Sequence, residues 1–151
     1  MDTRSLGEGV AHITFEAFDG LGRAAQPVDT WVRIDRTPPT AVVEAPPQAS
    51  GRFPVVVAFS EPVQALRARH LDVDGGVATH VDGDGAVYVV DVVPDRNADD
   101  VRVAVDVGVV RDAAGHANAR SDVVTVVHDP PRWTRLVDGV PTRWVARAAL
   151  R

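Results

Sequence analysis

Valine in alternation with other residues is the feature that most limits how this chain can fold. Between residues 101 and 107 every second residue is valine, and arginine, alanine and aspartate fill the positions between them. Between residues 53 and 59 the alternate positions carry phenylalanine and valine. A period of two places such residues on one face of a β-strand. Because β-branched residues also favour strands, we expect an all-β protein.

Turn-forming residues divide the chain into short strands. The runs expected to be strands are residues 10–17, 31–34, 40–45, 53–59, 71–73, 77–81, 86–93, 101–107 and 122–128. Asp74-Gly75-Gly76 predicts a hairpin turn between two of these runs, and residues 82–85 predict a second turn. Short strands with frequent turns and no clear helix are typical of an antiparallel Greek-key sandwich.

The chain repeats one of its turns. Asp19-Gly20-Leu21-Gly22 is similar to Asp112-Ala113-Ala114-Gly115, and each copy is followed by a strand-like run and a double proline, at 38–39 and 130–131. The two aspartates lie about 93 positions apart, close to the ~100 residues of one immunoglobulin-type sandwich. The repeat therefore indicates two successive modules, each ending in the same turn and linker.

The repeat predicts three parts of the chain. Residues 1–36 are expected to be the C-terminal fragment of a preceding module, residues 37–129 a complete module, and residues 130–151 a basic tail or linker. Two strands alone are marginal in water. We therefore expect residues 1–36 to pack against the next module or to be poorly ordered.

Composition and charge exclude several classes of function. The chain has no cysteine, which rules out disulfides and thiolate metal sites. Residues 1–131 hold 11 arginines against 20 acidic residues, a net charge of −9, which argues against nucleic-acid binding. Residues 132–151 hold 5 arginines and one aspartate, a net charge of +4. No run is apolar enough for a membrane span, and the first residues show no signal peptide.

Five segments, in order, resemble the bacterial Ig-like repeat, which occurs in tandem in large surface adhesins and other secreted multidomain proteins. The resemblance covers about residues 36–129. The segments that carry it are DRTPPT at 35–40, VVVAFSEPV at 55–63, LDVDGGV at 71–77, YVVDV at 88–92 and DAAGHAN at 112–118.

The resemblance implies an Ig-like Greek-key β-sandwich that acts as a spacer or adhesive module. It implies a place outside a bacterial cell, on its surface or in a secreted protein, with no catalytic activity of the module's own. Its partners would be neighbouring Ig-like modules of the same polypeptide and, for an adhesive module, a ligand on a host or matrix surface.

Calcium is the only cofactor that the chain suggests. In some tandem Ig-like and cadherin-like arrays, acidic residues of linkers and loops meet at a junction and bind calcium, which takes several oxygen ligands. Asp35 in the linker, Glu61 after one strand and Asp112 in the repeated turn could converge in this way. The alternative is that Asp112 caps its own turn, Glu61 is solvated and Asp35 ends a strand.

No motif for catalysis is present. The chain has no G-x-S-x-G sequence, no phosphate-binding loop and no zinc spacing among its five histidines. Two other functions stay open. The chain could be a carbohydrate-binding accessory module of a secreted hydrolase, which would need a row of exposed aromatic residues drawn from Trp31, Tyr88, Trp133 and Trp144. It could also belong to a secreted enzyme whose catalytic part lies elsewhere.

Overall fold

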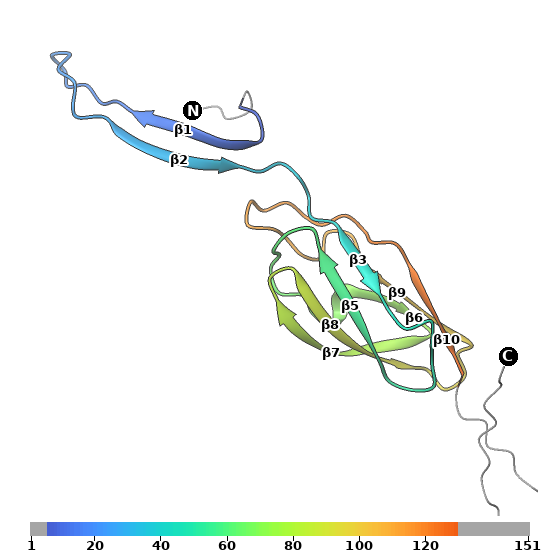
Figure 1. The fold of residues 1–151 in the computed structure, drawn as a ribbon. Helices are drawn as coiled ribbons and strands as arrows, with labels where there is room; N and C mark the ends of the chain where they lie inside the picture. Colours follow the sequence, from blue (N-terminus) through green and yellow to red (C-terminus); the bar gives the residue numbers. More distant parts are fainter. Residues whose placement is uncertain (1–5, 130–151) are drawn as a thin grey trace, which may run out of the picture.

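The computed structural model describes residues 6–129, which form a hairpin and a two-sheet sandwich (Figure 1). Apart from one short 3₁₀ turn, η1 (Ala68–His70), the described part of the chain contains strands and loops only. The strands are β1 (Gly9–Phe15), β2 (Val28–Ile34), β3 (Ala41–Glu44), β4 (Gln48–Ala49), β5 (Phe53–Phe59), β6 (Leu71–Asp74), β7 (Gly76–Asp84), β8 (Val87–Pro94), β9 (Asp100–Val105) and β10 (Val124–His128). The all-β prediction is confirmed.

The sandwich consists of two four-stranded sheets. Their strand orders are β3-β5-β8-β7 and β4-β10-β9-β6. Every neighbouring pair is antiparallel except β4 and β10, which run parallel. The first strand of the sandwich is split at a proline pair, so β3 lies in one sheet and β4 in the other. With that split, the strand order matches the Greek-key arrangement of constant-type immunoglobulin domains.

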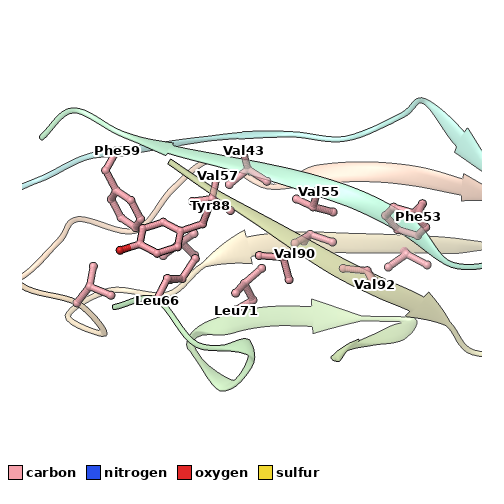
Figure 2. Close-up of a cluster of buried hydrophobic side chains, with 14 of the residues drawn as sticks. Val43, Phe53, Val55, Val57, Phe59, Leu66, Leu71, Tyr88, Val90 and Val92 are labelled. Atoms are coloured by element: carbon pink, nitrogen blue, oxygen red, sulfur yellow. The ribbon is translucent and has the colours of Figure 1, made fainter. Parts of the chain in front are cut away.

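The core lies between the two sheets and is built mainly from valine. Inward-facing residues of β5, β8 and β9 are almost fully buried, as the two-residue period requires. Tyr88 packs edge-on against Phe59, with ring centroids 6.1 Å apart, at one end of this layer (Figure 2). Each fully buried valine contributes roughly 1.5–3 kcal/mol relative to an exposed one. This burial supports a stable fold without any disulfide.

The predicted hairpin at Asp74-Gly75-Gly76 is wrong. The strands on either side of it belong to different sheets, because β6 pairs with β9 whereas β7 pairs with β8. Gly75 has φ 76°, and a Cβ atom there would collide with the Asp100 carbonyl oxygen. The two glycines therefore let the chain cross closely from one sheet to the other. The second predicted turn does join a hairpin, between β7 and β8, although β7 itself continues to Asp84.

Other boundaries agree with the sequence to within a few residues. Strand β5 has the predicted limits, and β4 was not predicted at all. Pro54 lies inside β5, at a point beyond the last pair that β5 makes with β3. Its missing N–H therefore costs no ladder bond on that side. The predicted basic tail, residues 130–151, lies outside the described residues.

The hairpin of β1 and β2 lies beyond one end of the sandwich (Figure 1). The two strands pair only with each other. One face is apolar, with Ala11 and Ile13 half-buried and Phe15 and Val28 more than half exposed. The predicted pair of N-terminal strands is therefore present, with an apolar face that no second sheet covers in the described structure. That residues 1–36 are the C-terminal fragment of a preceding module stays a prediction.

Candidate functional site

The repeated turn at Asp112 lies at the end of the sandwich that faces the hairpin. Asp112 is 2% exposed. Its Oδ1 accepts a hydrogen bond from the His116 backbone N–H at 2.8 Å, and its Oδ2 lies 3.0 Å from His116 Nδ1. A bridge between Arg111 and Ala117 closes the turn, and Gly115 has φ 94°. Asp112 thus caps its own turn, one of the two alternatives left open by the sequence.

These contacts set the ionisation of Asp112. Burial disfavours its charged form, but hydrogen bonds from the backbone and ring of His116 and from the Gly115 backbone outweigh burial. Together they lower the pKa of Asp112 below its usual value. The carboxylate is therefore charged at neutral pH although it is buried.

The turn at Asp19 repeats the same geometry. Its Oδ1 accepts from the backbone N–H groups of Leu21 and Arg23, both at 2.9 Å, and Oδ2 accepts from Arg23 Nε at 2.7 Å. The backbone N–H of Gly22 donates to the Asp19 carbonyl, as Gly115 does to Asp112. Hydrogen bonds from Arg23, backbone and side chain, and from the Leu21 backbone lower the pKa of Asp19. The two predicted copies of the turn are therefore alike in structure as well as in sequence.

Asp35 and Glu61 lie beside the Asp112 turn. One ligand atom each from Asp35, Asp112 and His116 lies within 4.8 Å of the others. Asp35 and Glu61 line one hollow of about 360 Å³, together with Arg33, Pro62, Ala113 and Ala114. The sequence-predicted residues Asp35, Glu61 and Asp112 are thus brought to one end of the sandwich.

The pKa of Glu61 is raised above its usual value. Desolvation is the largest cause that raises its pKa, and the negative charges of Asp35 and Asp112 raise it further. Arg33 and His116 act in the opposite direction but do not compensate. The junction therefore carries an excess of negative charge, which a cation or a protonated Glu61 would relieve.

The donor set only partly fits calcium. Calcium takes six to eight oxygen ligands, and three carboxylates supply some of these. Both oxygens of Asp112 already contact His116, and Asp35 Oδ1 accepts from the Thr37 N–H at 3.1 Å. His116, a nitrogen donor, was not among the predicted residues, although its place four positions after Asp112 puts it in the same turn. Calcium binding stays a prediction.

Aromatic residues do not form a row in the described part of the chain. Trp31 is 68% exposed and lies against His12, with ring centroids 4.5 Å apart. Tyr88 is buried in the core, where its hydroxyl lies 3.4 Å from the Val63 carbonyl oxygen. Trp133 and Trp144 lie outside the described residues. Tyr88 is therefore unavailable to stack on a sugar.

Two facing sheets with this strand order define an immunoglobulin-like β-sandwich protein. A family described as bacterial Ig-like domain matches residues 35–127, and the chain belongs to this family. The match confirms the resemblance seen in the sequence and covers all of the sandwich except the last residue of β10. Domains of this family are generally structural or adhesive and generally without catalytic activity.

No curated protein and no solved structure gave a match to the chain. Within the residues that the structure describes, no helix is long and apolar enough to cross a membrane.

Proposed function

We propose that this chain is a non-catalytic spacer or adhesive segment of a bacterial surface or secreted protein built from Ig-like modules in series. The hairpin is the end of one module and the sandwich is the next. Family membership supports the structural role, because Ig-like domains of this kind are generally structural or adhesive. The similarity between the hairpin and the last two strands of the sandwich, β9 and β10, supports the arrangement in series.

The observation that carries the proposal is the strand register. In the sandwich, Val103 of β9 pairs with Val124 of β10. In the hairpin, Ala11 of β1 pairs with Val32 of β2. Both members of the second pair precede those of the first by 92 positions, from 11 to 103 and from 32 to 124. The hairpin therefore has the register of the last two strands of the sandwich, around a similar capped turn whose aspartate lies one position further from the first strand in the sandwich.

The two faces of the hairpin also match those of β9 and β10 in polarity. The valines of β9 and β10 that face the sheet β3-β5-β8-β7 are buried, except for Val124, which is half-buried. The matching face of the hairpin is the more apolar one. The opposite face carries His12, Thr14, Asp29 and Arg33 beside the exposed Val10 and Trp31, and Thr14 donates a 2.6 Å hydrogen bond to Asp29. An apolar face of this kind is expected to pack on a second sheet. The front half of a preceding module would supply that sheet.

Hydrogen exchange tests this arrangement directly. The 151-residue chain is compared with a longer chain that includes any residues its gene encodes immediately upstream. We expect the β1–β2 amides to exchange fast in the shorter chain and slowly in the longer one, while the β9–β10 amides stay equally protected in both. Unchanged exchange of β1–β2 in the longer chain would rule out the preceding module as the cover of the hairpin.

Location and ligand are tested on cells. The proposal places the module outside the cell, so a protease added to intact bacteria of the source species should cleave the parent protein or find it in the medium. Protection until the cells are lysed would contradict it. An adhesive role, as opposed to a pure spacer, further requires that the module bind a host or matrix surface.

A further inference from the structure

The outer face of the sheet β3-β5-β8-β7 carries a group of apolar residues, here called the valine patch. Its members are Val42, Val56, Ala58, Val87 and Val89. Val42 is 62% exposed, Val87 53% and Val89 42%, and the other two are half-buried.

The strand register makes the patch continuous. Ala58 pairs with Val42 on one side and with Val87 on the other, so the three form one row across the sheet. Val56 pairs with Val89 in the next row. Side chains in directly paired positions on one face lie about 5 Å apart and are in contact. The patch therefore spans three strands and two rows.

The opposite outer face of the sandwich is more polar, although Val123 and Val127 are exposed there. On β4-β10-β9-β6, Arg120 forms ion pairs with Asp72 and Asp106. Arg102 and Thr125 face outward beside them. Antiparallel sheets usually present polar residues to water, and contiguous exposed apolar residues usually mark a contact site. The fold itself does not require the valine patch.

Acidic residues border the patch on both sides. Asp84 pairs with Val87 and Asp82 with Val89 along β7, and Glu44 pairs with Val56 along β3. All three carboxylates are exposed, and no arginine forms an ion pair with them among residues 6–129. The surface therefore suits an occupant that is both apolar and positively charged.

We propose that the chain's own segment 132–151 covers the valine patch. It holds five arginines and one aspartate, together with two tryptophans, two leucines and three valines. The apolar side chains would pack on the valines while the arginines face the acidic border. This proposal concerns the outer face of the sheet β3-β5-β8-β7 and does not depend on the proposed function.

The route from the end of β10 to the patch is short. Asp129 lines a hollow of about 370 Å³ with Arg52 and Pro54, which lie at the start of β5. Pro54 lies on the same outward side of β5 as Val56, two positions on. A chain of this length, if extended, spans up to about 70 Å, whereas a seven-residue strand spans about 23 Å. The segment is therefore long enough to lie along β5 and β8.

A nitroxide label on the segment tests the proposal in the full chain. Because the chain has no native cysteine, Ala146→Cys gives one labelling site. We expect the label to cause the largest loss of NMR peak intensity at the valine methyls of the patch. Val123 and Val127, each 53% exposed and next to or on β10 on the other outer face, are the matched internal controls. Equal loss at both sets, or none at the patch, overturns the proposal.

Two further measurements separate the alternatives. Substituting V42T, V87T and V89T together should reduce the loss read at Val56, whereas the matched change V123T and V127T should leave it unchanged. Mixing isotope-labelled chain without the nitroxide with unlabelled chain that carries it should give no loss at Val56. The same loss in the mixture would show that another copy's segment occupies the patch, which also overturns the proposal.

Discussion

Replacing Asn118 by alanine should weaken the sandwich more than any other single loss of one polar side chain near the junction. Asn118 is 1% exposed and lies in the loop between β9 and β10. Its Oδ1 accepts from the Val110 N–H at 3.0 Å, and its Nδ2 donates to the carbonyl oxygens of Asp106 at 2.7 Å and Ala119 at 2.8 Å. Asn118 thereby connects the first part of the loop that carries the Asp112 turn, at Asp106 and Val110, to its last part.

The expected magnitude follows from these three bonds. The two bonds that Nδ2 donates contribute about 1 kcal/mol each, and a buried donor left without an acceptor costs about 1–3 kcal/mol. The Val110 N–H would be left in that state, so Asn118→Ala should lower the free energy of unfolding by about 3–5 kcal/mol. A domain of this size is usually stable by about 5–15 kcal/mol, so the variant should still fold.

Urea unfolding at 25 °C followed by circular dichroism measures the change. At an m-value of about 1.5 kcal/mol/M, the midpoint should fall by about 2–3 M. Asn97→Ala is the matched control, because Asn97 is the only other asparagine and is exposed in a turn. It should change stability by less than about 0.5 kcal/mol. A loss for Asn118→Ala no larger than that of the control would refute the reasoning.

Three further outcomes are expected. Gly75→Ala should lower the melting temperature much more than Gly85→Ala, since both have positive φ but only Gly75 lacks room for a Cβ atom; similar losses would contradict the close crossing. The pKa of Glu61 is raised in the folded protein, so ionisation of Glu61 destabilises the fold once the pH is above that pKa. Glu61→Gln should therefore raise the melting temperature at pH 7 and not at pH 3. Equal shifts at both pH values would argue against the charge effect. If calcium binds at the junction, millimolar calcium should raise the melting temperature of the native chain and not of Asp35→Asn, and no change in the native melt excludes the site.

The sequence predicts much of the fold because its strongest signals are local. The alternation in β5 and β9 is a property of one strand and does not depend on the partner strand. The failed hairpin at Gly75 shows where local signals end. A glycine pair permits a tight turn and a close crossing between sheets equally well, and only the long-range pairing of β6 with β9 decides between them. Strand β4 has two residues, too few for any period to be visible.

At the junction, too, the sequence predicts only part of what the structure contains. Asp35, Glu61 and Asp112 were expected together because linker and loops meet at one end of a Greek-key sandwich, and the structure brings them there. The contact of His116 with Asp112 depends on the turn's backbone geometry, which residue types alone do not show. The valine patch was missed because the run from Val55 to Ala58 is apolar throughout, which hides its outward half.

The parallel pairing of β4 with β10 has a mechanical consequence. The sandwich receives its chain from the hairpin at one end, and β10 leads toward the other (Figure 1). Beside β10, Val127 N–H donates to the Pro47 carbonyl at 3.1 Å, and Asp129 N–H donates to the Ala49 carbonyl at 2.9 Å. A pull on the two ends slides these strands past each other, so the bonds share the force simultaneously and do not open one after another. A module in a tandem array can in this way resist stretching through two short strands, β4 near its start and β10 at its end.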